Sequence, residues 1–343
     1  QPLGYRRINV GHMHWTDPEA DHGYEPWISH HGWLETVPEE VRARYAWESQ
    51  SVTRRTTGGP SPRTREEYVG RFVADKAIEQ IEGAVAEGAP FLCWTAFHEP
   101  HPSFYPPHDV YAQFDQASIP PPVQAPPDAP DPHPYIARKQ EEWAHLTDVE
   151  VRQIMAGYYG LVELVDDFIG SVLAALDRLG IRDNTIIIWT SDHGEQLYEH
   201  RLFTKFCMYE ASVHVPLVIH VPGHAPGVRT ELVEHVDLFP TICDLVGIET
   251  PEHVQGRSLT PLLQSTLTPT AWRDAVFSQI ADLQMIRTAD WKLNAYEGTP
   301  GELYHLARDP AEFYNLIDEA ASAEIVNDLW QRLKAWERAH APD

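Results

Sequence analysis

Apolar residues recur along this chain at two spacings, and the two kinds of stretch alternate. Helical spacing covers 68–81 and 151–176, and each stretch follows a Thr-x-x-Glu capping box. Continuous apolar runs at 90–97 and 185–190 come soon after these helices and are typical of buried strands. Because a helix leading into a buried strand is typical of α/β proteins, the pattern predicts an α/β domain.

Further elements extend this domain. Residues 5–10 and 215–221 are strand candidates, and 237–246 predicts a short helix closed by Gly247. Eight prolines lie between positions 120 and 134, which excludes a helix or an interior strand there. We therefore expect an extended surface segment in this region.

The pattern changes after about residue 272. Four short runs separated by turn residues predict an antiparallel sheet, at 275–280, 284–288, 291–296 and 302–305. A last amphipathic helix is predicted over 323–340, with Ser322 as its N-cap. These patterns divide the chain into residues 1–272, an α/β domain, and residues 273–343, a small α+β subdomain.

The composition argues against several classes of partner and structure. Of the 343 residues, 26 are Lys or Arg and 51 are Asp or Glu, so the net charge is −25. Because such a field repels nucleic acid and anionic lipid, we expect neither as a partner. No apolar run approaches the ~18 residues of a membrane span. Three Cys without a Cys-x-x-Cys pair argue against a disulfide scaffold or a Cys-based zinc finger. The start at Gln1, without a signal-like segment, predicts that the gene product begins further upstream.

Two of the predicted strands lead into polar clusters. Residues 90–97 precede His98–His101, and residues 185–190 precede Asp192 and His193. In open α/β sheets, ligands bind beyond the carboxyl ends of the strands. A carboxylate next to an imidazole suits one metal ion. The alternative is that Asp192 caps a loop and that His193 has no special role.

Three other polar residues are candidates for the same chemistry. Lys205 lies 13 residues after Asp192 among apolar neighbours, where it could face an oxyanion beside the metal or simply reach the surface. His12 and His14 follow the first strand and would share one face of an extended segment. They could converge on one group, or each could be a hydrogen-bonded structural residue.

A series of motifs runs through nearly the whole chain. In order, they are Leu3-Gly-Tyr-Arg6 with Val10-Gly-His-Met-His14, Phe97-His-Glu-Pro-His101-Pro102, Ser191-Asp-His-Gly-Glu195, Leu202-Phe-Thr-Lys205, Asp237-Leu-Phe-Pro-Thr241, Gly256-Arg-Ser-Leu259, Arg287-Thr-Ala-Asp-Trp-Lys292 and Gly301-Glu-Leu-Tyr304. This series resembles the sulfatase family of the alkaline phosphatase superfamily, which includes arylsulfatases, choline sulfatases and phosphonate monoester hydrolases. The resemblance implies a three-layer α/β/α sandwich around a mostly parallel sheet, followed by a small C-terminal α+β subdomain with an antiparallel sheet.

The resemblance also implies roles for individual residues. Asp192 and His193 would be metal ligands, and Lys205 would bind the transferring sulfuryl or phosphoryl oxygens. His101 would serve the leaving oxygen as an acid. His14 would match the histidine that lies near the family's nucleophile. The implied partner is a small anionic ester, and the last helix and the proline-rich segment are candidate surfaces for a homo-oligomer.

Two positions depart from the family pattern. The family usually has Lys where this chain has His12, so the charge there depends on pH. Phosphonate monoester hydrolases also lack that Lys, which keeps a phosphonate or phosphate ester substrate open. The Asp-His metal pair, in place of Asp-Asn, favours Mn²⁺, Zn²⁺ or Fe²⁺ over Ca²⁺. From the resemblance as a whole we expect one divalent ion, Mn²⁺ or Ca²⁺, with Zn²⁺ and Fe²⁺ also open.

The family's nucleophile is the largest departure. It lies in a Cys/Ser-x-Pro-x-Arg element, whose first residue is oxidised to formylglycine in sulfatases, and the 343 residues contain no such element. The two N-terminal Asp metal ligands are absent as well. Three hypotheses follow: a metal-dependent hydrolase of sulfate esters whose formylglycine lies upstream of Gln1, a phosphonate or phosphate mono- or diester hydrolase, or an inactive truncated relative. In each case we expect negligible turnover by this chain alone.

Overall fold

The computed structural model describes residues 3–14, 22–50, 58–264 and 272–340. These residues form two compact units. The first unit holds the described residues up to Pro121 and His145–Thr185, and the second holds Pro122–Ala144 and the described residues from Ile186 onward. The predicted boundary at 272/273 is not one of the points where the chain passes between these units, and it stays a prediction.

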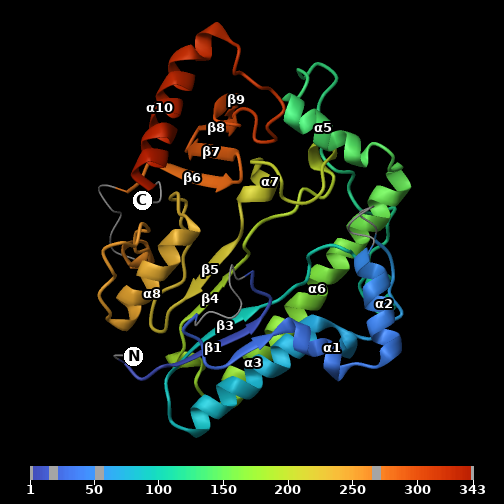
Figure 1. Cartoon of the computed structure of the whole chain (residues 1–343), viewed down its shortest axis with the longest axis vertical. Helices are drawn as coiled ribbons and strands as arrows, with labels where there is room; N and C mark the ends of the chain where they lie inside the picture. The colour runs from blue at the N-terminus through green and yellow to red at the C-terminus, as the bar shows by residue number, and fades with distance from the viewer. Residues whose placement is uncertain (1–2, 15–21, 51–57, 265–271, 341–343) are drawn as a thin grey trace. The chain divides into compact units, whose positions relative to one another are not determined.

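The first unit contains a parallel sheet of three strands in the order β2-β1-β3. Strands β1 and β3 of this sheet lie side by side in Figure 1. Its strands and α-helices are β1 (Arg6–Gly11), β2 (Trp27–Ser29), α1 (Trp33–Thr36), α2 (Glu39–Gln50), α3 (Val69–Ala86), β3 (Phe91–Ala96), α4 (His108–Tyr111) and α6 (Asp148–Arg178). Short 3-10 helices are η1 (His30–Gly32), η3 (Arg65–Glu67) and η4 (Arg182–Asn184). The strands predicted at 5–10 and 90–97, and the two long helices, are therefore confirmed.

Helix α3 packs on one face of this sheet. Ile8 and Val10 of β1 are fully buried beneath it. Successive residues of a strand point to opposite faces. Leu92 and Trp94 of β3 accordingly point away from the α3 side and are 39% and 46% exposed. The strand predicted to be buried throughout is thus an alternating strand with one covered face.

The capping boxes explain where the two long helices begin. The Thr147–Glu150 box caps α6 as predicted. The box that starts at Thr64 caps the 3-10 helix η3 instead, and α3 begins only at Val69. Tyr68 separates the two because its backbone is extended and its buried hydroxyl donates to the Tyr105 carbonyl. A tertiary contact therefore moves the helix start beyond the local signal.

Helix α2 was not predicted from the sequence. Its buried residues are Val41 and Glu48, which give no helical apolar stripe. The Glu48 carboxylate accepts from the Arg63 guanidinium at 2.6 Å and from the Ser61 hydroxyl at 2.7 Å. A buried charge of this kind is stable only when it is paired. Contacts beyond the helix therefore hold α2 in place.

The second unit contains two antiparallel sheets. Its strands and α-helices are α5 (Pro134–Trp143), β4 (Ile187–Thr190), α7 (Glu210–Val213), β5 (Leu217–His220), α8 (Leu238–Val246), α9 (Thr260–Leu263), β6 (Ala275–Ile280), β7 (Leu283–Thr288), β8 (Trp291–Tyr296), β9 (Thr299–His305) and α10 (Ala323–His340). Short 3-10 helices are η5 (Glu199–Arg201), η6 (His235–Asp237) and η7 (Ala320–Ser322). Strands β4 and β5 form one antiparallel pair, and β6 to β9 form the predicted C-terminal antiparallel sheet. The expected α/β class, with a parallel sheet and a C-terminal antiparallel sheet, is confirmed.

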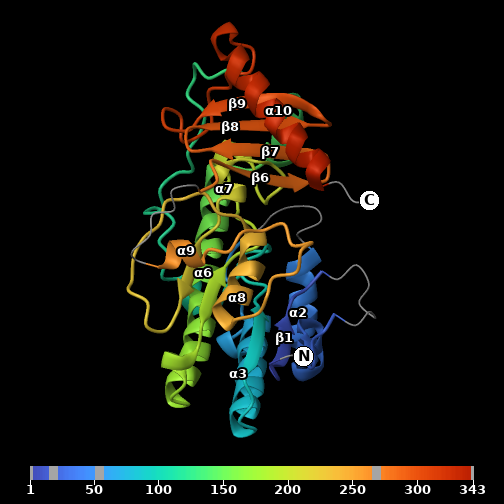
Figure 2. The ribbon, with the colours of Figure 1, turned by 90° about the vertical axis from the view of Figure 1, so that its left-hand side faces the viewer.

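The C-terminal sheet is covered on both faces. On one face, Leu293 and Leu303 pack against Leu329 and Leu333 of α10, which lies along the sheet in Figure 2. On the other face, the sheet packs against the segment 202–209. The sheet therefore supports the segment that carries Lys205.

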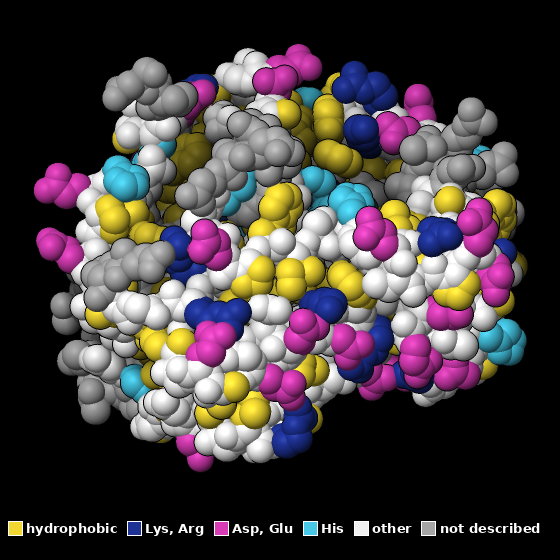
Figure 3. Space-filling view, turned by 60° about the horizontal axis from the view of Figure 1, so that its bottom comes forward, with side chains coloured by type: hydrophobic (Ala, Val, Ile, Leu, Met, Phe, Trp, Pro, Cys, Tyr) yellow, Lys and Arg dark blue, Asp and Glu magenta, His cyan; other side chains and the backbone are white. Residues whose placement is uncertain are grey.

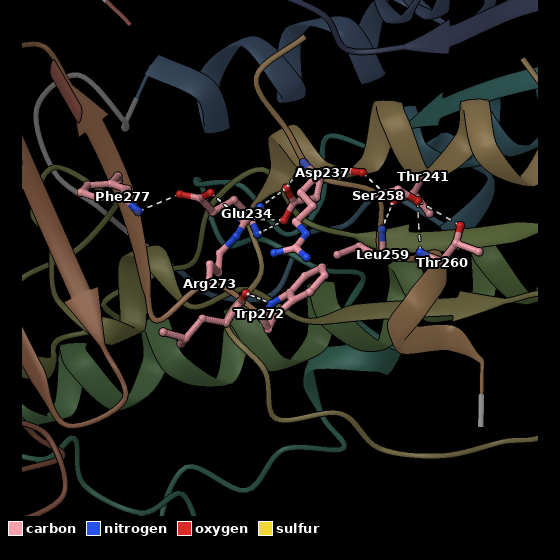
Figure 4. Close-up of polar contacts among 11 residues, drawn as sticks. Glu234, Asp237, Thr241, Ser258, Leu259, Thr260, Trp272, Arg273 and Phe277 are labelled. Atoms are coloured by element: carbon pink, nitrogen blue, oxygen red, sulfur yellow. Dashed lines mark hydrogen bonds and ion pairs between the residues drawn. The ribbon is translucent and has the colours of Figure 1, made fainter. Parts of the chain in front are cut away.

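The motif Asp237–Thr241 forms a buried polar junction. Arg273 donates two hydrogen bonds to the fully buried Asp237 carboxylate, at 2.6 and 2.8 Å, and also pairs with Glu234 (Figure 4). The Thr241 hydroxyl accepts from the backbone of Leu259 at 2.8 Å. Removing one member of such a buried ion pair typically costs about 3–5 kcal/mol. This motif therefore has a structural role, joining η6 and α8 to the chain on either side of α9.

The surface matches the acidic composition. On the face drawn in Figure 3, the described Lys and Arg side chains lie among Asp and Glu side chains and form no continuous basic patch. Within the described ranges, no helix combines the length and the apolar character needed to cross a bilayer.

Candidate active site

Three predicted site residues lie together in the second unit, in the turn after β4 and in the segment 202–209. We call Asp192, His193 and Lys205 the Lys205 group. His193 Nδ1 lies 2.8 Å from the Gly194 carbonyl, which can only accept a hydrogen bond, so Nδ1 carries the proton. His193 Nε2 then presents its lone pair to Lys205 Nζ at 2.8 Å. The side chains of Lys205 and His193 therefore touch directly.

The third member of the Lys205 group faces solvent. The Asp192 side chain is 83% exposed, whereas that of His193 is 24% exposed. Asp192 Oδ2 lies 3.6 Å from His193 Nε2. This arrangement places an accessible carboxylate beside an imidazole whose position is set by its backbone hydrogen bond.

Glu195 closes the loop that brings Lys205 back to His193. Its carboxylate accepts from the backbone amides of Thr204 at 2.6 Å and Leu197 at 3.1 Å. Burial raises the pKa of Glu195. No role was assigned to this residue from the sequence, although it ends the Ser191–Glu195 motif. Its partner amides could not be identified without the fold.

The backbone of this loop is strained. Among the described residues, eight non-glycine residues have a positive φ, and five of them lie in the loop: Leu197, Tyr198, His200, Arg201 and Thr204. Each such residue typically costs about 1–3 kcal/mol and persists only where its surroundings hold it. The hydrogen bonds that the Glu195 carboxylate accepts from the loop backbone are one such constraint.

The other three predicted residues lie in the first unit. His12 follows Gly11, where β1 ends; a Cβ at Gly11 would collide with the Ala96 carbonyl, so only glycine fits there. His12 Nε2 lies 2.9 Å from His14 Nε2, and His12 Nδ1 lies 3.2 Å from His30 Nε2. The expected convergence of His12 and His14 is thus present, with a further imidazole that the sequence did not single out.

More imidazoles extend this group. The ring centroids of His98 and His101 are 5.0 Å apart, and those of His98 and His12 are 5.4 Å apart. The His30 and His31 ring centroids are 4.0 Å apart. We call the set the histidine cluster: His12, His14, His30, His31, His98 and His101. The pair at 30–31, directly after β2, is the sequence signal that could have revealed it.

The environment within the histidine cluster opposes protonation. Burial lowers the pKa of His30 to about 4, and the neighbouring His31 and His12 contribute in the same direction. In His101, Nδ1 lies 3.0 Å from the Pro102 carbonyl, so Nδ1 is the donor and Nε2 is the nitrogen that gains or loses a proton. The cluster therefore combines a poor base, His30, with a histidine whose tautomer is fixed.

The Lys205 group offers two suitable metal donors. Nδ1–H donation to a carbonyl leaves His193 Nε2 with the lone pair that a metal ion would bind, and the exposed Asp192 carboxylate supplies oxygen. Because that lone pair faces Lys205 Nζ at 2.8 Å, a metal ion at Nε2 would replace the Lys205 contact. Mn²⁺, Ca²⁺ and Zn²⁺ take four or more ligands, so others are needed. Across the described ranges, no three His, Cys, Asp or Glu side chains gather in a geometry that could hold a metal ion. Asp192 and His193 therefore fit as part of a metal site.

Two family profiles match this chain, and they overlap in its middle. The family profile "Sulfatase" matches residues 1–248, and the profile "N-sulphoglucosamine sulphohydrolase, C-terminal" matches residues 198–339. Together these matches cover both units.

Individual relatives agree with the profiles. The multifunctional alkaline phosphatase superfamily protein PehA of Trinickia caryophylli is 31% identical over 93% of this chain and 68% of its own length. Arylsulfatase K of Rattus norvegicus is 37% identical over 55% of this chain, and the match spans 36% of that protein. The crystal structure of phosphonate monoester hydrolase of Agrobacterium radiobacter superposes with a TM-score of 0.79 at 25% identity, covering 99% of this chain and 79% of that one. The chain thus spans about a third of the arylsulfatase K that it matches.

Proposed function

Because this chain belongs to the sulfatase family of the alkaline phosphatase superfamily, we propose that it acts in the metal-dependent hydrolysis of sulfate esters. The observation that carries the proposal is the Lys205 group. There, an ammonium contacts an imidazole of fixed tautomer at 2.8 Å, beside an exposed carboxylate. Such a group could bind the negatively charged oxygens of an ester in spite of the net charge of −25.

Sulfuryl transfer mainly requires positioning and neutralisation of charge on the transferring oxygens. A divalent ion held by Asp192 and His193 would neutralise part of that charge. Lys205 would bind the same oxygens through Nζ, as a compact ammonium with three donors. Preorganised donors of this kind act more strongly as charge builds up in the transition state.

Proton transfer to the leaving alcohol is assigned to His101. Its Nδ1 donates to the Pro102 carbonyl at 3.0 Å, which leaves Nε2 to carry the proton that the leaving oxygen receives. His14 and His12 are assigned to the ester group as further donors. The family's nucleophile, a formylglycine, is assigned to a segment outside these 343 residues, and the proposal gives no covalent role to any residue of the chain.

A phosphonate or phosphate ester is the second candidate substrate. The observation that favours it is His12, which stands where the family usually has Lys and whose two ring nitrogens both contact other imidazoles. The relatives named multifunctional alkaline phosphatase superfamily protein and phosphonate monoester hydrolase belong to the same superfamily. Imidazoles could serve either kind of anion, because both present charged oxygens.

The test is an assay panel on the full-length protein supplied with Mn²⁺ or Ca²⁺. The substrates are an aryl sulfate, an aryl phosphonate and a bis-aryl phosphate with the same leaving group. We expect the highest kcat/KM on the sulfate and a formylglycine-containing peptide in the mass spectrum. A higher kcat/KM on the phosphonate or the diester selects the second candidate. No turnover on any of the three overturns both and leaves an inactive relative.

A further inference from the structure

Helix α7 contacts both parts of the Lys205 group. The Ser212 hydroxyl donates to the Lys205 carbonyl at 2.9 Å, and the Gly194 amide donates to the Ser212 carbonyl at 2.8 Å. A Cβ at Gly194 would collide with the Ala211 carbonyl, so the turn that carries His193 lies directly against α7. One residue, Ser212, thereby joins the two backbone segments that carry the Lys205 group.

A network of charged side chains, centred on a buried lysine, fixes the position of helix α7. Lys292 of β8 is fully buried, and its Nζ lies 3.0 Å from a Glu210 oxygen and 2.8 Å from a Glu312 oxygen. Glu312 also accepts from the Glu210 backbone amide at 2.6 Å, and Arg287 of β7 pairs with the Glu210 carboxylate at 3.1 Å. Burial raises the pKa of Glu210, but the hydrogen bond from His214 and the charges of Lys292 and Arg287 outweigh it and hold that pKa well below its usual range. The first residue of α7 is therefore fixed through both its side chain and its amide.

The same face of the C-terminal sheet also holds the residue before α7. The Tyr209 hydroxyl donates to the buried Glu302 carboxylate at 2.9 Å, and its ring stacks on His200 with centroids 4.0 Å apart. Alternation along the strands places Lys292 of β8 and Glu302 of β9 on the face that packs against the segment 202–209. The sheet thus anchors α7 at two consecutive residues.

We infer that Ser212 is a positioning residue for Lys205 and that the Lys292–Glu210–Glu312 network anchors the helix from which it acts. The strained backbone between residues 197 and 204 needs such an external constraint, because relaxation of that loop would move Lys205 away from His193. This inference rests on the proposed function and extends it to the role of the C-terminal sheet.

The test compares Ser212→Ala with Ser258→Ala in the full-length protein. Ser258 also forms side-chain hydrogen bonds within a loop, to Thr260, and contacts neither Lys205 nor Gly194 among the described interactions. We expect Ser212→Ala to lower kcat on the aryl sulfate by about 10- to 100-fold with a smaller change in KM. Ser258→Ala should leave both unchanged, and Ser212→Thr, which keeps the hydroxyl, should restore most of the activity.

A double-mutant cycle separates positioning from general destabilisation. If Ser212 acts through Lys205, Ser212→Ala should cause no further loss of kcat in a Lys205→Ala background. An equal loss in both backgrounds overturns the inference. The anchor is tested by Lys292→Arg, which should keep more activity than Lys292→Met at temperatures where both variants are folded. Equal activities of the two folded variants overturn the role of the network.

Amide hydrogen exchange tests the positioning role of Ser212 without an activity assay. Peptides covering 194–208 should exchange faster in Ser212→Ala than in the wild type, and should not change in Ser258→Ala. If the wild type hydrolyses none of the esters, the proposed function falls, and exchange alone decides the inference. Unchanged exchange in Ser212→Ala then overturns it.

Discussion

The Lys205 group and the histidine cluster present different basic side chains. In the Lys205 group there is one amine, and its position depends on backbone contacts from Glu195 and Ser212. In the histidine cluster imidazoles contact imidazoles, so each added proton would repel the next. Burial, and then that repulsion, lowers the pKa of His30.

This difference bears on how the acidic protein would bind the anionic ester that we propose as its substrate. An ammonium binds an anion as a compact point charge, but it needs a rigid frame because its stem is long and flexible. Imidazoles need less support, but their affinity for an anion falls as they lose protons. Substitutions in the two groups should therefore have different effects.

Replacement of Lys205 should have the largest effect. We expect Lys205→Ala to lower kcat on the aryl sulfate by about 10²–10³-fold, the usual cost of removing one preorganised donor to a transition-state oxyanion. The melting temperature should change little, because Lys205 is only half-buried. Lys334→Ala is the matched control, since Lys334 forms an ion pair with Glu337 on α10. Near-normal activity of Lys205→Ala would remove Lys205 from the site.

Asp192 should be needed for the metal ion. Asp192→Asn keeps the size of the side chain but removes its charge, so we expect the affinity for the divalent ion to fall at least about tenfold. The measurement is metal content per protein after equilibration in buffers of known free metal concentration. Asp244→Asn, an exposed aspartate of α8 in the same unit, is the control. An unchanged metal content would exclude Asp192 as a ligand.

His12 should contribute to substrate binding through the charge at its position. His12→Lys puts an ammonium where the family usually has one, so we expect it to lower the KM for the aryl sulfate severalfold relative to the wild type. His12→Gln, which keeps a hydrogen-bond donor without a charge, should not lower the KM. The same KM in all three proteins would contradict a role for His12 in anion binding.

The smallest effect concerns stability at acid pH. Burial lowers the pKa of His30 in the first unit and of His200 in the second, each to about 4. The unfolded chain, with an ordinary pKa near 6.5, then binds more protons than the folded one between pH 6.5 and 4. Each histidine should therefore reduce the free energy of unfolding by at most about 1.4 kcal/mol per pH unit as the pH falls through that window.

Urea unfolding at several pH values between 4.5 and 7.5 measures this contribution. His200→Gln should reduce the slope of the free energy of unfolding against pH, whatever its effect at pH 7. The exposed His224 provides the control, and His224→Gln should leave the slope unchanged. A slope that does not change in His200→Gln would show that His200 is not held neutral in the folded protein.

Local signals in the sequence determined the long elements. The capping box at Thr147 marks the start of α6, and apolar runs mark β3 and β4, because both signals depend on residues a few positions apart. The two functional clusters also follow local motifs, since Asp192 and His193 come directly after a strand. Family membership rests on the same motifs in their order along the chain.

The surroundings of those motifs depend on contacts between elements that lie far apart in the chain. Ser212, which donates to the Lys205 carbonyl, lies on the same helix as Glu210. Glu210 is paired with Lys292, which lies 82 residues further along the chain. The third imidazole at His12 is His30, 18 residues away. Periodicity and capping report contacts within one element, whereas these contacts join separate elements. The sequence therefore singled out the candidate residues, and the packing of one element on another set which side chains hold them in place.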